Sequence, residues 1–574
     1  MALGETKGKY AHYRFGYEEG RFSIFAGTEK EKGVSLVSQR DPVREAERHI
    51  GPFRLRPGML AVVAGVSHLP MLEMLAEQLK NEAGKGGWIL AFEADTELYL
   101  ALKKRRPDIF AEVAVIVPEN LAVMAELVEK IDVENFVGYR VFENKAGIDI
   151  DPSFYAQTIG DFKKKLASRF SDLFTRLEFE ERWVFNSLSK LSLMHRARPV
   201  SALFGLGRGA DALIVSTGPS LRDSLAEIKA QRDRYFIACA DSAYRVLVRA
   251  GIVPHLVFSL DSQAHTTKHF GLLPHGVAGD FPILVCDAVS NPVAARDWQG
   301  ELAISYTAQF PDDRRMVSPG CDFLEEEGFI AGAVGLVPGD LQSGGSVATS
   351  IFDLMRLMDF DRIILVGQDL AYTRREIHTP GTHHTDEWLA KTTNRLQPLE
   401  NINERVIRRR HTRRETSLTG RPIVTDYILS LYRDWFATAI DRLNSVVIDS
   451  QGSTQSQKIL NATKDGLQIP GAQSFALSPG SQSAGINGVI LEKFLAAKTL
   501  QIDAAKIENL SGRMQSALKD ETYASGLPFL RYVGRKFAIK AMRTPENKEA
   551  LLKKQRIKQR NFLNKITSKL YRHG

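Results

Sequence analysis

Two stretches of this chain alternate short apolar runs with amphipathic helical patterns, and this alternation restricts the folds that it can adopt. In the first stretch the apolar runs begin at Leu60, Trp88 and Val113. In the second they cover residues 212–216, 235–240, 256–260, 282–286 and 363–367. Continuous apolar runs of this length are typical of strands that a parallel sheet buries on both faces, and helices supply the right-handed crossovers between them. The sequence therefore predicts an α/β protein with two Rossmann-like parallel-sheet domains, followed by a helical C-terminal region.

The length of the chain and the positions of these stretches divide it into four segments. At about 100–200 residues per domain, 574 residues suffice for three or four domains, each with its own core. We expect an N-terminal Rossmann-like domain with a small strand-rich cap (1–160), a helical connector (161–200), a second α/β domain (201–475), and a linker with a basic helical region (476–574). Residues 473–488 are rich in Ser, Gly and Ala, as in a flexible linker.

Composition argues against several other classes of protein. Hydrophobic residues make up 44% and charged residues 25% of the chain, which is typical of a folded globular protein. The sequence has no apolar window of about 18 residues, and its first residues lack the apolar core of a signal peptide. Cys239, Cys286 and Cys321 are far apart and lack the spacing of a zinc site. We therefore expect a cytoplasmic protein without a transmembrane segment, a disulfide scaffold or a structural zinc ion.

Positive charge is concentrated at the C-terminus. The whole chain carries a net charge of +8, and residues 543–574 alone account for that excess. Within this tail, Phe562, Leu563, Ile566 and Leu570 form an apolar stripe at helical spacing. We expect a helix that packs by this stripe on the protein or on a partner, ahead of a helix that attracts an acidic acceptor. Docking on an anionic membrane is a further alternative. Nucleic-acid binding is not predicted, because neither aromatic interleaving nor a known motif accompanies the charge.

The first α/β stretch carries acidic residues after its second apolar run. Glu93 and Asp95 stand where a dinucleotide-binding domain places the carboxylate that binds ribose. However, the turn after the first apolar run has one glycine, Gly65, where that fold needs three. We therefore expect a structural Rossmann-like domain with a vacant site.

In the second α/β stretch, the first apolar run ends in a glycine turn of the phosphate-binding type. Thr217, Gly218, Pro219 and Ser220 follow it, with the proline at the first position of the expected helix. Such a turn presents free backbone N–H groups and the positive end of a helix dipole to an anion. A tight turn with a good helix cap is the structural alternative.

Acidic residues follow three further apolar runs. These residues are Asp241, Asp261 and Asp369. Because the carboxyl ends of parallel strands meet at one edge of a sheet, we expect the three aspartates to line one cleft with the glycine turn. A second glycine turn with Ser343 and Gly344 precedes a helical pattern and is another candidate anion site. The phosphate-binding loop of common NTPases is absent.

A histidine-rich loop follows Asp369. It contains His378, His383 and His384. Because no carboxylate spacing supports a zinc site, we predict no metal ligand here. A histidine at the edge of the sheet can instead act as a general base toward a substrate hydroxyl. A surface loop that happens to carry histidines is an equally open alternative.

Taken in order, these motifs resemble a known family. Ser-Thr-Gly-Pro-Ser-Leu, Ala-Asp-Ser-Ala-Tyr, Ser-Leu-Asp-Ser, Gln-Ser-Gly-Gly-Ser-Val-Ala-Thr, Gly-Gln-Asp-Leu-Ala-Tyr and Thr-His occur between Asp211 and His384. This order is similar to that in the motility-associated factor (Maf) proteins, which are bacterial flagellin glycosyltransferases. The central domain of that family is similar to the bacterial sialyltransferases that use CMP-activated nonulosonic acids. A weaker resemblance extends upstream from Ser38 and downstream from Asn461.

The resemblance implies roles for individual residues. Thr217, Gly218, Pro219 and Ser220 match the turn that holds the cytidine phosphate of the donor, and Ser343 matches a serine beside the donor. Gly344 and Asp369 are further donor-binding candidates. His383 matches the proposed general base, and Tyr372 lies near a tyrosine that steadies the leaving phosphate. Asp241 and Asp261 replace asparagines of the sialyltransferases. Two carboxylates repel a phosphate unless a cation or protons intervene, so Mg²⁺ is conceivable, although no cofactor is firmly predicted.

The resemblance therefore implies a reaction and its partners. The expected reaction transfers a pseudaminic- or legionaminic-type nonulosonic acid from a CMP-activated donor to Ser or Thr of flagellin, as required for flagellum assembly and motility. One alternative is a Mg²⁺-dependent diphosphokinase, since the central domain is also similar to archaeal 6-hydroxymethylpterin diphosphokinases. The other alternative is a flagellin-binding protein without catalytic activity.

Overall fold

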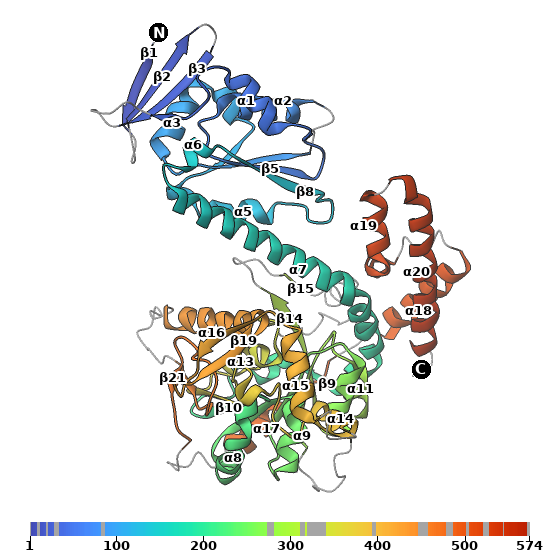
Figure 1. Ribbon diagram of the computed structural model, residues 1–574. Coiled ribbons are helices and arrows are strands. Elements are labelled where there is room, and N and C mark those ends of the chain that lie inside the picture. Colours follow the sequence, from blue (N-terminus) through green and yellow to red (C-terminus); the bar gives the residue numbers. More distant parts are fainter. Residues whose placement is uncertain are drawn as a thin grey trace, which may run out of the picture. The chain divides into compact units, whose positions relative to one another are not determined.

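The computed structural model divides the chain into two compact units, which are described separately (Figure 1). The first comprises Met1–Glu178 and Gly534–Arg556, and the second comprises Phe179–Val533 and Ile557–Gly574. The structure describes residues 2–7, 12–18, 21–27, 34–81, 86–271, 281–309, 316–317, 340–392, 398–445, 457–477, 486–500, 504–520, 527–543 and 545–570. Two helices, α7 (Pro152–Lys190) and α20 (Lys548–Leu570), contribute residues to both units.

The first unit begins with a small antiparallel sheet. Its strands are β1 (Ala2–Lys7), β2 (His12–Glu18), β3 (Arg21–Gly27) and β4 (Val34–Ser35), paired in that order. Tyr13, Phe15 and Ile24 of these strands are buried in the core of the unit, together with Leu72 and Leu98. The expected strand-rich cap is therefore present.

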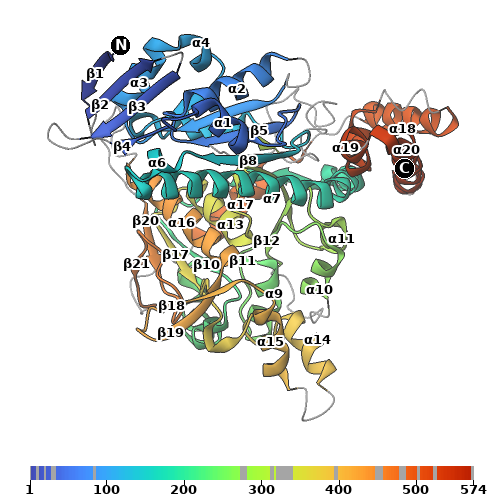
Figure 2. The same ribbon diagram turned by 45° about the horizontal axis from the view of Figure 1, so that its top comes forward.

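A four-stranded parallel sheet forms the centre of the first unit. Its order is β7 (Ala114–Ile116), β6 (Trp88–Phe92), β5 (Met59–Ala64) and β8 (Gly138–Glu143). Alternate residues of β5 enter two cores. Ala61 and Val63 pack with α2 (Leu69–Lys80) and α3 (Thr96–Arg105), and Leu60 and Val62 pack with α5 (Val123–Glu129) and α7. Figure 2 shows α7 along the sheet, and helices on both faces confirm the predicted Rossmann-like arrangement.

The second unit is built on a larger parallel sheet. Its central order is β14 (Leu302–Gln309), β13 (Ile283–Asp287), β12 (Leu256–Ser259), β11 (Phe236–Ala240), β10 (Asp211–Val215), β17 (Arg362–Val366) and β20 (Lys458–Asn461). Each neighbouring pair in this order is parallel. Four short strands extend it: β9 (Ala197–Pro199), β15 (Met316–Val317), β16 (Asp340–Gln342) and β21 (Gln473–Ser474). The five predicted strands are confirmed, whereas β14 and β20 were not predicted.

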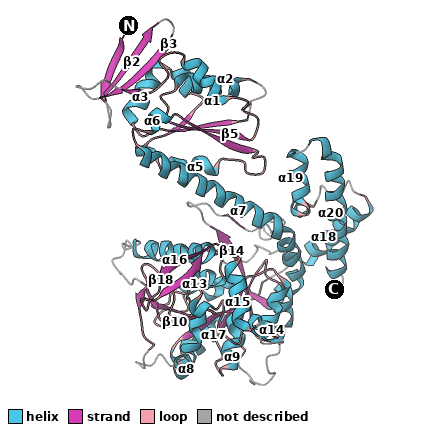
Figure 3. Cartoon of the chain, viewed as in Figure 1, coloured by secondary structure: helices cyan, strands magenta, loops and turns pink. Residues whose placement is uncertain are grey.

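Helices cover both faces of this sheet (Figure 3). Leu213 and Val215 of β10 enter a core with α9 (Asp241–Arg249) and the end of α7. Ala212 and Ile214 face the other way, toward α13 (Val347–Leu357), α16 (Tyr427–Ser445) and α17 (Ile486–Ala496). The sheet is therefore doubly wound, as the continuous apolar runs predicted.

The C-terminal helices pack into these cores. Leu510 and Met514 of α18 (Ala504–Lys519) and Phe562, Leu563 and Ile566 of α20 are buried in the second unit, so the predicted apolar stripe packs on the protein itself. α19 (Arg535–Arg543) belongs to the first unit. The compact units thus divide the C-terminal region differently from the expected limit at residue 476. Residues 478–485 of the expected linker lie outside the described residues.

Two smaller expectations concern cysteines and membranes. Cys239 and Cys286 are buried and free, and Cys321 lies outside the described residues. Among the helices that the structure describes, none combines the length and the apolar character needed to cross a bilayer.

Both sheets contain a topological switch point. In the first unit the chain runs from β5 through β6 to β7 and then returns to place β8 on the other side of β5. In the second it runs from β10 to β14 and returns to place β17 beside β10. Ligands of doubly wound sheets bind at such points, outside the carboxyl ends of the two strands that flank the reversal. The residues after β5 and β8, and those after β10 and β17, are therefore the positions to compare.

Candidate active site

The glycine turn after β10 packs tightly on the end of β17. The N–H of Gly218 donates to the carbonyl of Gly367 at 2.8 Å. A Cβ atom on Gly218 would lie 2.3 Å from Oδ1 of Asp369 and 2.4 Å from the oxygen of Gly367. Only glycine allows this approach. The turn continues into a short 3₁₀ helix, η5 (Pro219–Asp223), and then α8 (Leu225–Ala230), rather than into one α-helix as predicted. The N–H of Gly218, which was expected to face an anion, therefore has a partner within the protein, and no α-helix dipole starts at this turn.

Asp369 holds this turn in place. Its carboxylate accepts the backbone N–H of Ser220 at 2.9 Å and the Ser220 hydroxyl at 2.6 Å. Asp369 is buried, and that burial raises the pKa of its carboxyl to about 6. The predicted donor-binding residues Ser220 and Asp369 are thus brought together, and their side chains contact each other.

Asp241 lies beside the same turn, at the start of α9. Its carboxylate accepts the N–H of Ser242 at 2.7 Å and the hydroxyl of Ser259 at 3.0 Å. Ser242 Oγ is in turn 3.4 Å from Oγ1 of Thr217. Burial raises the pKa of Asp241 to about 7, so much of this group is neutral near pH 7. Because a neutral carboxyl does not repel a phosphate, the departure from asparagine at this position does not by itself require a cation.

Asp261 follows β12 and is more exposed. Its Oδ1 accepts the N–H of Gln263 at 2.9 Å, and its Oδ2 lies 3.7 Å from Nε2 of His265. Its backbone carbonyl accepts the N–H of Asn291 at 3.0 Å. This carboxylate therefore faces a histidine that the sequence analysis did not single out.

The second glycine turn is occupied by contacts within the protein. The Ser343 hydroxyl accepts the N–H of Gly345 at 3.1 Å, and the N–H of Gly344 donates to Oγ1 of Thr349 at 2.9 Å. A Cβ atom on Gly344 would lie 2.4 Å from the Trp435 ring of α16. The amide of Gly344 that was expected to face an anion thus has a partner in α13.

Tyr372 forms a buried polar group with two residues that the sequence analysis missed. Its hydroxyl donates to Oδ2 of Asp426 at 2.6 Å, and Nη1 of Arg410 donates to the same oxygen at 3.1 Å. Asp426 ends β19 (Pro422–Asp426), and Arg410 lies two residues before its partner strand β18 (Thr412–Thr416). Burial and the neighbouring Asp426 raise the pKa of Tyr372. The half-exposed guanidinium of Arg410 is the cationic group of this cluster.

The histidines lie in a short helix rather than in a loop. α14 comprises His383–Lys391. It begins at His383 because the Thr382 side chain caps it by accepting the N–H of Thr385. His378 precedes this helix and connects it to the glycine turn: its Nδ1 lies 3.3 Å from Oγ1 of Thr217. The N–H of Thr379 also donates to the Thr217 carbonyl at 2.9 Å. The histidine that contacts the glycine turn is therefore His378, five residues before the predicted base His383.

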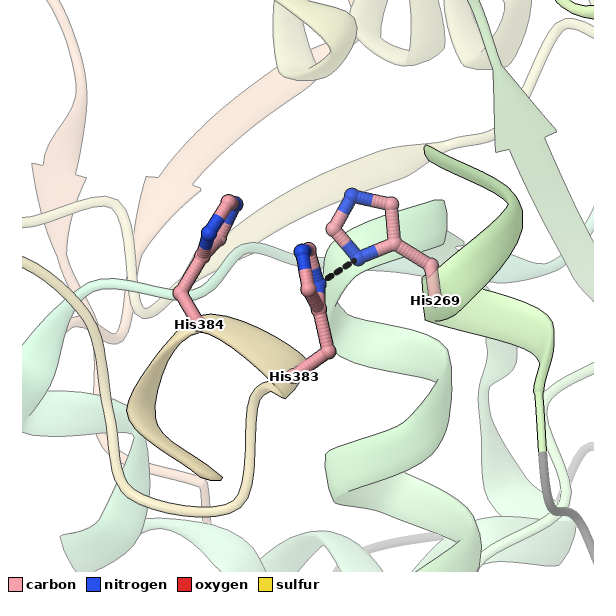
Figure 4. A group of neighbouring side chains, drawn as sticks. All are labelled: His269, His383 and His384. Carbon is pink, nitrogen blue, oxygen red and sulfur yellow. Dashed lines mark hydrogen bonds between the residues drawn. The ribbon is translucent and has the colours of Figure 1, made fainter. Parts of the chain in front are cut away.

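His269 joins this cluster from a distant part of the sequence. It lies on α10 (Thr267–Phe270), and its Nδ1 is 2.8 Å from Nδ1 of His383. Figure 4 shows the rings of His269, His383 and His384 gathered, with His383 in the middle. His269 follows β12, so its position in the topology could have been inferred, but its contact with His383 across 114 residues could not.

Burial keeps these imidazoles neutral. Burial, together with the neighbouring histidines, lowers the pKa of His378 and His383 to about 4 and that of His269 to about 2. The pKa of His384 is lowered for the same reasons. Neutral imidazoles present free lone pairs, so the cluster can accept a proton or bind a metal ion at neutral pH.

The switch point of the first unit is closed by the unit's own side chains. The Asn144 amide, after β8, donates to the Leu36 carbonyl at 3.1 Å and to the Ser67 hydroxyl at 2.5 Å. Glu93, after β6, accepts the N–H groups of Val66 and Asp95 at 2.9 and 3.1 Å and the hydroxyl of Tyr155 at 3.1 Å.

Asp95 is used in a similar way. It caps α3 by accepting the N–H of Glu97 at 3.0 Å, and it accepts the hydroxyl of Tyr13 at 3.0 Å. The predicted ribose-binding carboxylates are therefore committed to internal hydrogen bonds.

Comparisons with known proteins agree with this architecture. Residues 185–375 match the family described as 6-hydroxymethylpterin diphosphokinase MptE-like, a range that includes the glycine turn and Tyr372 but ends before His383. A protein of Treponema pallidum (strain Nichols), described as uncharacterized, is 29% identical over 105 residues, which are 18% of this chain. The aligned region is 49% of that relative, so the chain spans about half the length of the curated protein it matches.

A solved structure extends the similarity to almost the whole chain. The Maf glycosyltransferase from Magnetospirillum magneticum AMB-1 superposes with a TM-score of 0.54 at 14% sequence identity. The match covers 98% of this chain and 92% of that protein. The fold that the motif order implied is confirmed: this chain has the fold of a Maf glycosyltransferase.

Proposed function

We propose that this protein is an inverting glycosyltransferase that transfers a nonulosonic acid of the pseudaminic or legionaminic type. The donor is CMP-activated, and the acceptors are Ser and Thr hydroxyls of flagellin. The observation that carries the proposal is the contact between the glycine turn and the histidine cluster, where Oγ1 of Thr217 lies 3.3 Å from Nδ1 of His378. A phosphate-binding element and a neutral base at one switch point suit a transfer from a nucleotide donor to a hydroxyl.

His383 acts as the general base in this proposal. If its Nδ1–H donates to Nδ1 of His269, then Nε2 of His383 carries the free lone pair. The acceptor hydroxyl attacks the anomeric carbon and forms the new C–O bond as its proton moves to Nε2. The bond from the anomeric carbon to the phosphate oxygen breaks, and CMP leaves with the electron pair. His269 is a positioning residue because its hydrogen bond selects this tautomer.

In this scheme the leaving phosphate lies against the donor turn and is stabilised by the guanidinium of Arg410. In the proposal, Thr217, Gly218, Pro219 and Ser220 form the donor turn, and Asp241, Asp261, Ser343, Gly344 and Asp369 are further donor-binding residues. Tyr372 contributes through Asp426, because both Tyr372 and Arg410 donate to that carboxylate and the guanidinium is thereby oriented. The raised pKa of Asp241 reduces the repulsion between this carboxyl and the donor phosphate, so the scheme assigns no role to Mg²⁺.

A reconstituted assay tests the proposal. Purified flagellin is incubated with the full chain and CMP-pseudaminic or CMP-legionaminic acid, and the mass of flagellin is followed. Replacing the base in His383→Ala should lower the transfer rate about 10²–10⁴-fold and leave CMP binding unchanged. Full transfer by His383→Ala would move the role to His384 or remove it. No transfer by the wild-type chain from either donor would overturn the proposal.

The family match supports one alternative. A Mg²⁺-dependent diphosphokinase of the hydroxymethylpterin type is favoured by the similarity of residues 185–375 to the MptE-like family. Thermal unfolding in the presence of CMP, and separately of ATP with Mg²⁺, distinguishes the two enzymes, because each nucleotide stabilises only the protein that binds it. Flagellin binding without stabilisation by either nucleotide would instead indicate a flagellin-binding protein without catalytic activity.

A further inference from the structure

Three histidine side chains converge close to the glycine turn. His269 comes from α10, whereas His383 and His384 begin α14. One nitrogen atom from each ring lies within 4.8 Å of the others. His269 and His383 are buried, and His384 is partly buried (Figure 4). From these observations we propose that His269, His383 and His384 form a binding site for a transition-metal ion of the zinc class.

The ligand type selects the ion. Imidazole nitrogen suits zinc, cobalt, nickel and copper, whereas magnesium prefers oxygen ligands. The sequence-based expectation of no metal ligand considered the three histidines at 378–384 without His269. With His269 present, three nitrogen ligands are available, which is the number that catalytic zinc sites use while they keep a fourth position for water.

The distances permit coordination after small side-chain rotations. Zn–N bonds of about 2.0–2.1 Å at tetrahedral angles place ligand nitrogens about 3.4 Å apart. The Nδ1 atoms of His269 and His383 are 2.8 Å apart and must separate slightly, and one nitrogen atom of each of the three rings already lies within 4.8 Å of the others. Metal binding would therefore replace the hydrogen bond between His269 and His383 with two bonds to the ion.

Ion pairs fix the two helices that carry the ligands. Lys268, beside His269, forms a salt bridge with Glu387 of α14. Asp386, also on α14, forms salt bridges with Arg245 at 2.8 Å and Arg249 at 2.9 Å, both on α9. α10 and α14 are thus held together through residues adjacent to the histidines, so little ordering is needed when an ion binds.

Two further histidines lie beside the proposed site. His378 stacks on His384 with ring centroids 5.7 Å apart, and its Nδ1 contacts Thr217. His265 lies with its ring 5.9 Å from that of His384 and faces Asp261. Polar groups that contact ligand histidines orient them in many metal sites. His378 therefore connects the proposed site to the donor turn.

The proposal is separable from the proposed transfer reaction. A metal ion on Nδ1 of His383 leaves the proton on Nε2, so the loaded ring cannot act as the base that we assign to it. Metal binding is measured without substrates, and transfer is measured on protein stripped with a chelator. Failure of either proposal therefore leaves the other open to its own test.

Cobalt provides the direct measurement. The full-length chain without a polyhistidine tag is stripped with EDTA, dialysed and titrated with Co²⁺ while the visible spectrum is recorded, and zinc affinity is measured by competition with a chelating dye. We expect one equivalent to bind, with the intense absorption of tetrahedral cobalt. His269→Gln, which can still hydrogen-bond to His383, and His384→Ala should each weaken binding at least about 100-fold. His411→Ala, at an exposed position outside the cluster, should bind as the wild type does.

Thermal unfolding of the metal-free variants shows whether each variant is folded. In the wild type, zinc should raise the unfolding temperature, and this increase should vanish in His269→Gln and His384→Ala. Absence of binding by the wild type at micromolar Co²⁺ and Zn²⁺ would overturn the proposal. Binding that is the same in His269→Gln and His384→Ala as in the wild type would also overturn it.

Discussion

The two parallel sheets of this protein share a topology but differ in what occupies their switch points. After β5 and β8, Asn144 and Ser67 hydrogen-bond to each other, and Glu93 accepts three donors from its own unit. After β10 and β17, the carboxylate of Asp369 accepts two hydrogen bonds from Ser220 of the glycine turn. Neutral histidines and Arg410 lie near this turn. Both switch points contain internal hydrogen bonds, but the second also holds the Arg410 guanidinium and neutral imidazoles, which are groups that can bind a ligand.

This difference separates fold from function within one chain. A doubly wound sheet creates the crevice wherever its strand order reverses, but the side chains after the strands decide whether a ligand can enter. In both units a buried carboxyl has a pKa raised to about 7, Glu93 in the first and Asp241 in the second. Glu93 is surrounded by three donors, whereas Asp241 has two and lies next to the donor turn.

The largest expected effect comes from the glycine of each turn. Gly218→Ala should lower the affinity for CMP at least about 100-fold, because its Cβ would overlap Asp369 and Gly367 and displace the turn by about 1 Å. The matched variant is Gly65→Ala. It should cost the first unit about 1–2 kcal/mol of unfolding free energy, since Gly65 has a φ of +87°, and leave CMP affinity unchanged. Equal CMP affinity in Gly218→Ala and wild type by calorimetry would remove the glycine turn from the donor site.

The next effect concerns Asp241 and its pH dependence. Its folded pKa of about 7 exceeds the ordinary value of 3.8, so its contribution to stability is present below about pH 4 and is lost as pH rises through 7. Because asparagine does not ionise, the free energy of unfolding of Asp241→Asn does not decrease in this way as pH rises. The free energy of unfolding of the variant, relative to wild type, should therefore rise by about 2–3 kcal/mol between pH 5 and pH 8. Asparagine can keep both hydrogen bonds, since the Ser259 hydroxyl can accept as well as donate.

Denaturant titrations of both proteins at the two pH values check this prediction. A difference in stability that does not change with pH would show that Asp241 is ionised in the folded protein, and its charge would then oppose a bound phosphate.

The smallest effect tests the closed switch point. Asn144→Ala removes two buried hydrogen bonds and leaves the Leu36 carbonyl and the Ser67 hydroxyl without this partner. We expect the first unit to lose about 1–2 kcal/mol of unfolding free energy, with CMP affinity unchanged. Calorimetric unfolding and CMP titration measure the two quantities. A weaker affinity for CMP in a folded Asn144→Ala variant would indicate that the first unit contributes to the donor site.

Local sequence patterns were sufficient for much of the fold and for one half of the candidate site. The five strands at 212–216, 235–240, 256–260, 282–286 and 363–367 were predicted because buried parallel strands are continuously apolar. The glycine turn was predicted because Gly218 and Pro219 directly follow one of them. β8 was missed, since most of its side chains are not buried and its sequence, Gly-Tyr-Arg-Val-Phe-Glu, lacks an apolar run.

The other half of the site depends on contacts that only the tertiary structure creates. His269 meets His383 across 114 residues, and Arg410 and Tyr372 meet on Asp426, which is 54 residues from Tyr372. No local pattern marks such pairs. The start of α14 did carry a local signal, since Thr382 is a good N-cap residue and Asp386 lies in the first turn. The sequence analysis nevertheless interpreted the histidine-rich segment as a loop.

Hydrogen–deuterium exchange with and without CMP tests the central difference between the two switch points most directly. Amides of a bound ligand site exchange more slowly, and peptides from both units are read in one experiment on the intact chain. We expect CMP to slow exchange in residues 216–221, 241–243 and 367–379 and to leave residues 64–68, 93–96 and 144–148 unchanged. Protection at the ends of β5 and β8, or no protection at the ends of β10 and β17 with saturating CMP, would contradict this account.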